Sequence, residues 1–574
     1  MNNAIITDKC SLYHHLLECQ PARNMKNVRA LLICPEFPLS FWSFQKSTEF
    51  MGAKTILPPL GLLTVAALLP AEWELRLVDL NTRNLTADDW QWADMILLSA
   101  MYIQQEGFLA LVREGKQRGK TVVAGGPYPT ALPDEALAAG CDFVVRGEGE
   151  NTIPLLLESM RAGEPGVIEN PAKPDITTSP IPRYDLLRLQ DYSNLAIQTT
   201  RGCPFDCEFC DVVNLFGRKP RHKTTKQVIA ELETLLRLGA AGSVFLCDDN
   251  FIGSKKYVRN ILKELSPWLK SRGEPFCFLT QASVNLGQDL AMIDLMTDAN
   301  LGTVFIGLES PDEDALQISC KYPNLHNPLV ESVNNIKRNG MSVIGSFILG
   351  LDGETKGAGQ RICAFMDQTS IPIAMLGLLQ APHHTKLWKR LEKEGRLRDE
   401  VHCDWGGTFG AMNYHPNRPA MEIMQEYIDA WDYLYEPSRF LARTYRFHLD
   451  MRPTRRAQAS DRGESLPRGN GHHSRRMSWG IQYQEVGAFF KLLWWQGIRS
   501  SCRLQFWKQL IGMWHQNPSR CKSYLKFCAM GMDLMTMRQV IREKVTAIMK
   551  ERGRDLHGKK SRPQADSYRQ SKNN

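Results

Sequence analysis

Three cysteines at a C-x3-C-x2-C spacing constrain this chain more than any other feature. Cys203, Cys207 and Cys210 lie within eight residues, so one loop has to hold three sulfur atoms around one centre. Thiolates are soft ligands that select iron–sulfur clusters, zinc or copper(I). Structural zinc takes four protein ligands, whereas a cubane cluster can accept three cysteines and leave one iron open. The run favours a 4Fe-4S cluster with an open iron; a zinc loop completed by a distant residue and unliganded buried cysteines are the alternatives.

The run from Arg201 to Asp211 resembles the cluster loop of the radical S-adenosylmethionine (radical SAM) superfamily. Phe209, directly before the last cysteine, matches the aromatic position of that loop. The resemblance implies that the open iron binds the amino and carboxylate groups of S-adenosylmethionine. It therefore predicts two cofactors, the cluster and S-adenosylmethionine, and places Phe209 among the cofactor-binding residues.

Composition bounds the size and the compartment of the protein. The chain has 574 residues, a net charge of +8 and 15 cysteines. This length suggests about three domains, and the charge alone does not imply a nucleic-acid partner. The cysteines are scattered and an exposed cluster would be damaged in an oxidising space, so we expect a cytoplasmic protein. The first residues lack a signal-peptide pattern, and no run of about 18 apolar residues predicts a membrane-spanning helix.

Residues 28–163 predict a doubly wound, Rossmann-like α/β domain. Short apolar runs alternate with helical stretches, which is the rhythm of a parallel sheet covered by helices on both faces. The predicted strands are Val28–Cys34, Glu74–Val78, Met95–Ser99, Thr121–Ala124 and Asp142–Val145. Ligands bind such sheets at the carboxyl ends of the strands. Those ends have Asp79, Ser99, the Gly125-Gly126 pair and Gly147.

The order of these strand-end motifs resembles the cobalamin-binding domain that precedes many radical SAM domains. The motifs are Pro58–Leu62, Val78-Asp79, Gly125–Pro127 and Gly147–Glu150. The resemblance implies that cobalamin is held by Asp79, Asn81, Ser99, Gly125, Gly126, Gly147 and Glu148. Some cobalamin domains have an Asp-x-His-x-x-Gly motif whose histidine binds cobalt, and here Asn81 stands in place of that histidine. Cobalt is then expected to lack a lower histidine ligand; a domain without cobalamin is the alternative.

A second domain of repeated strands and helices follows a linker. Residues 164–190 are rich in proline and small polar residues and predict the linker. Over 191–397 a strand–helix unit repeats at least five times, which predicts a partial or full (β/α) radical SAM barrel. The predicted strands are Leu195–Thr199, Ser243–Cys247, Phe276–Gln281, Thr303–Leu308 and Ser342–Leu349.

Polar residues and glycines follow these strands in an order that resembles the cofactor contacts of radical SAM enzymes. Asp248 and Asp249 match the position that binds the amino group of S-adenosylmethionine, where a carboxylate forms a charge-assisted hydrogen bond to an ammonium. The resemblance also assigns to cofactor binding Gln281, Glu309, Gly350 and Gly353. Glu309 would contact ribose or methionine, and the glycines would allow close approach of adenine. Taken singly, an acidic pair after a strand is also typical of a helix cap.

The last third of the chain predicts a mainly helical domain over 398–552. Residues 452–476 are rich in arginine and have almost no apolar side chains, so we expect a disordered insert. A polar, basic tail over 553–574 is also expected to be disordered. The region resembles, diffusely, the C-terminal domain of cobalamin–radical SAM proteins related to hopanoid and bacteriochlorophyll methylases.

An aromatic segment, Val486–Gln516, lies inside this helical domain. Leu504, Trp507, Ile511 and Trp514 share one face of a predicted helix. Such a face can touch the surface of a membrane or cover a lipid-like substrate, or it can pack a helical domain onto the barrel. We favour the packing and keep peripheral membrane contact as the alternative.

Together these features predict a cobalamin-dependent radical SAM methyltransferase that acts on an unactivated carbon of an apolar small molecule. By resemblance, the cluster donates one electron to S-adenosylmethionine, a 5′-deoxyadenosyl radical removes a substrate hydrogen, and methylcobalamin delivers the methyl group. The electron comes from an external one-electron reductant, no nucleic-acid partner is expected, and the sequence identifies no acid, base or nucleophile. The alternatives are a cobalamin-dependent cyclase or rearrangement enzyme, and a corrinoid or iron–sulfur sensor that binds nucleic acid.

Overall fold

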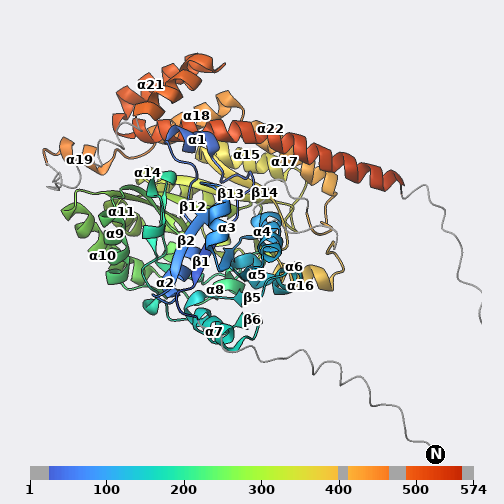
Figure 1. Ribbon diagram of the computed structural model, residues 1–574. Coiled ribbons are helices and arrows are strands. Elements are labelled where there is room, and N and C mark those ends of the chain that lie inside the picture. Colours follow the sequence, from blue (N-terminus) through green and yellow to red (C-terminus); the bar gives the residue numbers. More distant parts are fainter. Residues whose placement is uncertain (1–24, 399–411, 465–485, 559–574) are drawn as a thin grey trace, which may run out of the picture. The chain divides into compact units, whose positions relative to one another are not determined.

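The computed structural model of the chain describes residues 25–398, 412–464 and 486–558 (Figure 1). The chain forms two compact units. The first consists of Met1–Glu36 and Pro59–Leu187, and the second of Phe37–Pro58 and Arg188–Asn574. The chain therefore leaves the first unit after its first strand and returns at Pro59, so a short N-terminal segment belongs to the second unit.

The first unit is built on a six-stranded parallel sheet with the strand order β2-β1-β3-β4-β5-β6. Its strands are β1 (Arg29–Cys34), β2 (Glu74–Asp79), β3 (Met95–Ser99), β4 (Thr121–Gly125), β5 (Phe143–Arg146) and β6 (Gly166–Glu169). The order reverses between β1 and β3, and ligands bind doubly wound sheets at such a switch point. The predicted Rossmann-like fold is confirmed.

Helices cover both faces of this sheet because its strands are apolar on both sides. They are α2 (Leu60–Leu68), α3 (Ala87–Trp92), α4 (Gln105–Gln117), α5 (Pro127–Ala131), α6 (Pro133–Ala139) and α7 (Gly149–Ala162). On one face, α2 and α7 pack on alternate strand residues such as Leu32 and Leu97. On the other face, Gly115 of α4 lies directly on Ile96.

Strand β6 lies inside the segment predicted to be a linker, residues 164–190. It pairs in parallel with β5, from Phe143 with Gly166 to Arg146 with Glu169. Four residues of the predicted linker therefore form an edge strand of the sheet. Their side chains alternate between partly buried and exposed, and four residues are too short a run for periodicity to identify a strand.

The second unit contains another six-stranded parallel sheet, in the order β14-β13-β12-β11-β10-β7. Its strands are β7 (Leu195–Ile197), β10 (Gly242–Leu246), β11 (Phe276–Ala282), β12 (Leu301–Glu309), β13 (Ser342–Leu349) and β14 (Ile373–Leu378). β7 and β14 are its two edges, so the sheet has the partial form of the predicted barrel. A short antiparallel pair, β8 (Thr200–Arg201) and β9 (Arg221–His222), flanks the cysteines.

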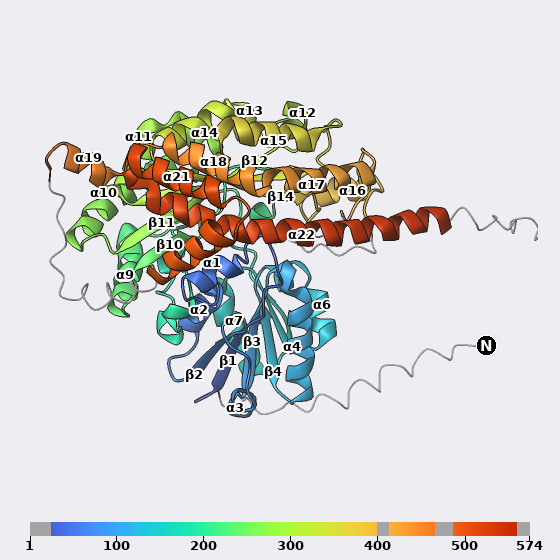
Figure 2. The ribbon, with the colours of Figure 1, turned by 90° about the horizontal axis from the view of Figure 1, so that it is seen from above.

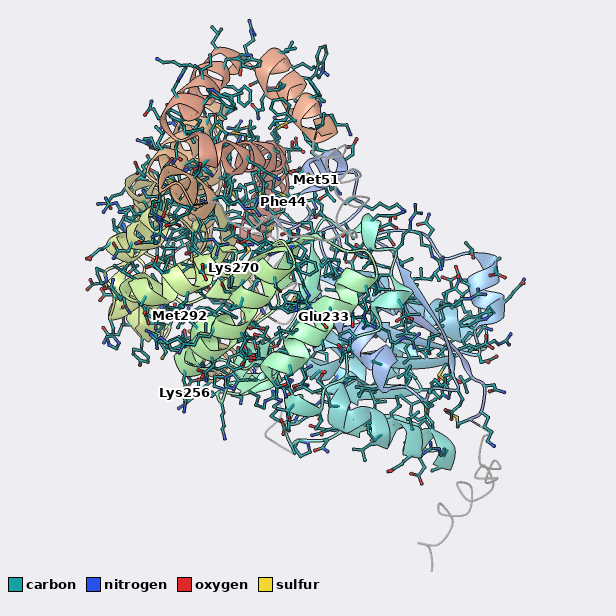
Figure 3. The ribbon with its side chains drawn as sticks, turned by 90° about the vertical axis from the view of Figure 1, so that its left-hand side faces the viewer. Phe44, Met51, Glu233, Lys256, Lys270 and Met292 are labelled. Atoms are coloured by element: carbon teal, nitrogen blue, oxygen red, sulfur yellow. The ribbon has the colours of Figure 1, made fainter. Side chains whose placement is uncertain are left out.

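Helices follow the strands of this second sheet and cover one of its faces. The longer ones are α9 (Thr225–Arg237), α10 (Lys255–Ser271), α11 (Leu290–Asp298), α14 (Leu329–Arg338) and α15 (Ala358–Thr369). The shorter ones are α8 (Val212–Phe216), α12 (Glu313–Ile318), α13 (Tyr322–Leu325) and α16 (Lys386–Lys393). Figure 3 shows Glu233 on α9, Lys270 on α10 and Met292 on α11. Glu233 accepts a hydrogen bond from Trp268 of α10 at 3.1 Å, and Lys270 pairs with Asp298 of α11 at 2.8 Å, so polar contacts join these neighbouring helices.

The N-terminal segment Phe37–Pro58 is held in the second unit by hydrogen bonds. Its helix α1 (Gln45–Phe50) begins at the carboxylate of Asp533, which accepts from the amides of Lys46 (2.8 Å) and Ser47 (3.0 Å). A carboxylate at this place satisfies amides that the first turn of a helix leaves unpaired. The segment lies inside the stretch predicted as the first domain, 28–163, and its partners lie far along the chain, where sequence reasoning could not find them.

The C-terminal part of the second unit is helical, as predicted. Its helices are α17 (Ala420–Leu434), α18 (Pro437–Leu449), α19 (Arg455–Asp461), α21 (Arg503–Gln516) and α22 (Cys521–Gly558). The long helix α22 runs along α17 and α18 in both Figure 1 and Figure 2. Among the described helices, none combines the length and the apolarity that crossing a bilayer requires.

Two predictions of disorder are wrong in part. Arg455–Asp461, inside the predicted insert 452–476, form α19, and both Arg455 and Arg456 pair with Glu274. Composition alone does not reveal such distant partners. Helix α22 runs to Gly558, so the first residues of the predicted tail 553–574 are helical. The remainders, 465–476 and 559–574, lie outside the described residues.

Arg443 joins α18 to the loop before β14, and we expect its replacement to lower the free energy of unfolding. Its fully buried guanidinium donates to the carbonyl oxygens of Ile371 (2.8 Å) and Leu434 (2.6 Å). Arg443→Met leaves these acceptors buried and unpaired, so we expect a loss of about 3 kcal/mol in the free energy of unfolding. Urea unfolding checks this, with the exposed Arg446→Met on the same helix as control. Equal midpoints for the two variants would contradict the assignment.

Candidate active site

The cysteine loop, residues 203–210, follows β7 and β8, and a buried carboxylate fixes its start. Asp248, after β10, is fully buried and accepts hydrogen bonds from the amides of Thr199 (2.7 Å) and Thr200 (2.9 Å) and from the Thr199 hydroxyl. These contacts commit the carboxylate to the strand that delivers the loop. The side chain has no exposed surface in this structure. Its predicted role, binding the amino group of S-adenosylmethionine, stays a prediction.

Gly202 and Asp249 set the next turn of the chain. Gly202 has a φ of +94°, and its amide donates to Asp249 at 2.7 Å. A Cβ at position 202 would lie 2.9 Å from the carbonyl oxygen of Gly217, so only glycine fits. The amide of Cys210 donates to the carbonyl oxygen of Cys207 at 3.1 Å and closes the loop. Asp249 orients the loop, and its contact with S-adenosylmethionine stays a prediction.

One cation acts on all three thiols of the cysteine loop. Burial raises the pKa of Cys203, Cys207 and Cys210, the last to about 12, and the positive charge of Lys321 opposes that rise at each of them. Lys321 pairs with Glu309 at 2.7 Å, and its ammonium lies 6.0 Å from the ring of Phe209. Three thiolates bring negative charge into a largely buried place, and Lys321 supplies a charge that balances it.

The donor set of the loop fits a 4Fe-4S cluster. Within the described residues, no three histidine, cysteine, aspartate or glutamate side chains converge on one point as the ligands of one metal ion would. A cubane makes no such demand, because each cysteine binds a different iron. Three thiols of one loop beside a partly buried lysine are a fitting setting for a 4Fe-4S cluster with one open iron.

Glu309 ends β12 in a strained backbone conformation. Its φ is +62°, which a residue with a side chain rarely adopts, and the register between β12 and β13 shifts between Gly307 and Glu309. Asn324 donates to the carbonyl oxygens of Gly307 (3.1 Å) and Leu308 (2.7 Å) and holds this bulge. Such strain persists where surrounding contacts fix it. Here it accompanies the pairing of the Glu309 carboxylate with Lys321, while a contact to ribose or methionine stays a prediction.

The two glycines assigned to adenine follow β13 and are required by the backbone. Gly350 (φ +98°) donates to Glu354 at 2.8 Å, and its carbonyl oxygen accepts from the Tyr414 hydroxyl at 2.6 Å. Gly353 has a φ of +92°, and a Cβ there would lie 3.0 Å from the backbone of Asp314. Burial raises the pKa of Glu354 to about 8. Both glycines thus shape the turn, whatever ligand lies beside it.

Gln281 lies near the carboxyl end of β11, two residues before Ser283, whose contact with Asn250 was not part of the prediction. Asn250 donates to Ser283 at 3.1 Å, and its side-chain nitrogen lies 4.0 Å from the sulfur of Cys203. Gln281 is partly exposed and is the register partner of Phe305 on β12.

Lys321 and Asn250 are site residues that sequence reasoning missed. Asn250 directly follows Asp248 and Asp249, so the run Asp-Asp-Asn itself carried a signal. No signal in the sequence identified Lys321, because it lies in an irregular connection and only the fold brings it to the cysteine loop. The preceding residue, Cys320, has a φ of +57°.

In the first unit, a polar cluster joins the ends of β1 and β2. Asp79 is buried and accepts hydrogen bonds from the backbone (3.0 Å) and the side chain (2.6 Å) of Asn81. The Asn81 side chain also donates to the carbonyl oxygen of Pro35 at 3.3 Å, as Gln104 does at 2.6 Å. Gln104 is a further residue that the sequence did not identify. Asn81 thus helps to position the loop after β1, which borders the switch point.

Glycines with positive φ follow β4 and β5 at the carboxyl ends of the strands. Gly126 has a φ of +93°, and a Cβ there would lie 2.6 Å from the Ser99 hydroxyl and 3.0 Å from the carbonyl oxygen of Ala100. Gly147 has a φ of +97°. The predicted cobalamin residues at the ends of β3, β4 and β5 are Ser99, Gly125, Gly126, Gly147 and the buried Glu148. A large flat ligand can approach the backbone closely at such an edge.

Comparison with protein-family models assigns both units. A B12 binding domain matches residues 52–157, and the radical SAM superfamily matches residues 197–366. A domain of unknown function, DUF4070, matches residues 385–547. The two α/β units thus define a protein that combines a cobalamin-binding domain with a radical SAM domain.

Similar proteins cover nearly the whole chain. An uncharacterized methyltransferase of Synechocystis sp. is 41% identical over 95% of this chain and 97% of that protein. The hopanoid C-2 methylase of Rhodopseudomonas palustris is 34% identical over 84% of this chain and 88% of that protein. A solved structure with a similar fold is that of the cobalamin-dependent S-adenosylmethionine radical enzyme OxsB with aqua-cobalamin bound. The match covers 92% of this chain and 81% of the OxsB chain, with a TM-score of 0.54. At 16% identity, that likeness shows the fold alone.

The chain belongs to the B12-binding radical SAM methyltransferases and is related to hopanoid C-2 methylase and bacteriochlorophyllide methyltransferases. It is a radical SAM, cobalamin-dependent methyltransferase, so the sensor alternative is set aside. A 4Fe-4S cluster, S-adenosylmethionine and cobalamin are the cofactors expected of this family. The cysteine loop fits the cluster in its donors. The glycines after β4 and β5, on the sheet whose order reverses between β1 and β3, fit cobalamin held without a histidine ligand from residues 79–83.

Replacing the three loop cysteines tests the cluster assignment. In the triple variant Cys203→Ala, Cys207→Ala and Cys210→Ala, we expect iron content and 5′-deoxyadenosine formation to fall to background after anaerobic reconstitution, because the ligands are gone. The control alters three cysteines elsewhere: Cys277→Ala, Cys502→Ala and Cys521→Ala. Iron assay and product chromatography provide the readouts. Tetrahedral zinc in the oxygen-free wild type, or equal nucleoside formation by both variants, would contradict the assignment.

Gly126→Ala tests the cobalamin edge of the first unit. Gly126 (φ +93°, ψ −179°) and Gly217 (φ +83°, ψ 174°) have similar backbone conformations, but a Cβ at Gly217 meets nothing within 4 Å. Alanine therefore has a similar backbone cost at both positions, about 1–3 kcal/mol, while only Gly126→Ala displaces Ser99 and Ala100. Gly217→Ala is the control. We expect cobalamin affinity to fall about tenfold in Gly126→Ala alone, which corresponds to about 1.4 kcal/mol. Visible absorption after gel filtration measures bound cobalamin, and equal occupancy in both variants would contradict the placement.

Proposed function

We propose that this enzyme methylates an unactivated carbon of an apolar, polycyclic small molecule, using an electron from an external one-electron reductant. The similarity to a hopanoid C-2 methylase supports this substrate class, because a hopanoid is a largely apolar ring system. The observation that carries the proposal is the character of one face of the second sheet.

The second sheet leaves one of its faces partly exposed. Parallel strands are usually buried on both faces, and residues such as Val244, Phe278 and Val304 are buried here. Their neighbours point to the opposite face and are less buried: Phe245, Leu279, Gln281, Thr303, Phe305 and Met375. Register places Phe245 beside Leu279 and Gln281 beside Phe305, so they form one surface.

An aromatic side chain from the N-terminal segment extends this surface. The ring of Trp42 lies 5.1 Å from that of Phe305, and Trp42 is 44% exposed. Two aromatic rings next to a partly exposed and mainly apolar strand face suit an apolar ligand more than a charged one. The segment Phe37–Pro58 thus gives the second unit a wall that the strand–helix repeat itself does not supply.

The chemistry of hydrogen abstraction and methyl transfer belongs to the bound cofactors, and the chain supplies position and a dry setting. Asp248 and Asp249 fix the cysteine loop through backbone amides. Lys321 balances the charge of the three thiolates. The partly exposed face of the second sheet, around Phe305, excludes water from the strand ends and orients the carbon skeleton of the substrate.

Isotope transfer tests this proposal. With S-adenosylmethionine carrying a trideuteromethyl group and apolar cell extract as substrate, we expect the label in a chloroform-soluble product that has gained one methyl group. Phe305→Ser should lower the rate of labelling about tenfold or more, because a substrate contact is lost. Leu290→Ser, exposed on α11, is the control.

Two outcomes would decide against the proposal. Label only in water-soluble products would contradict the apolar substrate. A converted product without added methyl would favour the cyclase or rearrangement alternative. Mass spectrometry of the two solvent phases distinguishes these results.

A further inference from the structure

The segment 486–516 presents a cluster of apolar side chains to solvent. Residues 486–494 are helical, a π-helical turn follows over Trp495–Arg499, and α21 comes next. Ten of the 21 exposed large apolar side chains among the described residues belong to it. We call them the outer face: Val486, Phe489, Phe490, Trp494, Trp495, Ile498, Leu504, Trp507, Ile511 and Trp514.

The outer face belongs to helices that are already packed on their other side. In α21, Phe506 and Met513 are fully buried, and Gln509 accepts a hydrogen bond from Tyr524 of α22 at 3.2 Å. Gln505 and Ser438 join α21 to α18 through hydrogen bonds of 2.8 and 2.9 Å. Figure 1 shows α21 beyond α18, on the side away from the sheet strands. The apolar surface is therefore not the packing face of the helical domain.

The two arms of the segment are fixed to each other. The indole nitrogen of Trp507 donates to the carbonyl oxygen of Gly497 at 2.9 Å. A Cβ at position 497 would lie 2.9 Å from the Trp507 ring, so glycine allows the close approach. The outer face is thus a preformed surface on two joined helical segments.

The charge of residues 486–532 indicates which kind of partner the outer face binds. Between Val486 and Met532 the sequence has no aspartate or glutamate but seven lysines and arginines. Four of these cations, all exposed, lie among the apolar side chains: Lys491, Arg499, Arg503 and Lys508. A second copy of the chain would bring the same positive charges to a two-fold contact, where they repel. Anionic headgroups complement them instead.

We propose that the outer face binds the surface of an anionic lipid bilayer. Tryptophans and phenylalanines are suited to the headgroup level, and aliphatic side chains such as Leu504 (80% exposed) can enter the acyl boundary. Lysines and arginines around them pair with lipid phosphates. This binding deepens the proposed function, since a bilayer is the natural source of an apolar substrate, but it does not need turnover.

Vesicle flotation of the full-length holoenzyme tests the surface. One variant replaces its three most exposed side chains: Phe490→Ser, Leu504→Ser and Trp514→Ser. The control replaces three exposed leucines elsewhere: Leu155→Ser, Leu238→Ser and Leu290→Ser. We expect binding to vesicles of phosphatidylcholine with phosphatidylglycerol to fall at least tenfold in the first variant only. Arg503→Gln with Lys508→Gln should remove the preference over phosphatidylcholine alone, and this second variant keeps the test decisive if the first fails to fold.

Two kinds of result would overturn the proposal. Wild type that does not float with anionic vesicles, or floats equally well with the outer face altered, excludes a bilayer as the partner. Self-association abolished by the same variant, without vesicle binding, would assign the face to a second copy. Methyl transfer to detergent-dispersed substrate should be unchanged in the variant. Vesicle binding without any apolar methylated product would refute the proposed function and leave the bilayer contact standing.

Discussion

The hydrogen bonds of one buried carboxylate govern the site of the second unit. Asp248 ends β10 and holds the amides of Thr199 and Thr200 after β7, while Asp249 holds Gly202. These bonds join adjacent strands at their carboxyl ends, so the place of the cysteine loop is set by the sheet and not by the loop. A carboxylate taken out of water is costly unless donors surround it. Here three donors do so, and the acidic pair therefore serves first as a support for the cluster ligands.

Left-handed backbone recurs at the strand ends of both units. Gly126 and Gly147 in the first unit, and Gly202 and Gly350 in the second, turn the chain where a side chain would collide or strain the backbone. Glu309 adopts a similar φ without being glycine, and the bulge held by Asn324 fixes it. Strain of this kind gathers where function requires a particular direction of the chain. In each unit, these turns lie at the carboxyl ends of the parallel strands.

Much of the fold and part of the site could be predicted from the sequence, for physical reasons. Buried parallel strands such as Met95–Ser99 are continuous apolar runs, and a sheet then dictates which residues meet at its edge. The cysteine spacing needs no long-range knowledge. Lys321 and the seating of Lys46 and Ser47 on Asp533 depend on partners brought together only by folding. The bonds of Asp248 to the amides of Thr199 and Thr200 could not be foreseen, because sequence does not distinguish a carboxylate facing a ligand from one facing backbone amides.

Helix α21 shows that prediction from sequence has the same limit for apolar side chains. Periodicity placed Leu504, Trp507, Ile511 and Trp514 on one stripe, and an apolar stripe ordinarily faces a core. The helix has a second stripe, with Phe506 and Met513, and that stripe makes the contact with the protein. A helix apolar on two sides satisfies one side by packing and leaves the other to a partner. The lack of acidic residues from Val486 to Met532 is what distinguishes that partner, since an ordinary protein surface mixes both signs of charge, whereas a bilayer of anionic lipids has one.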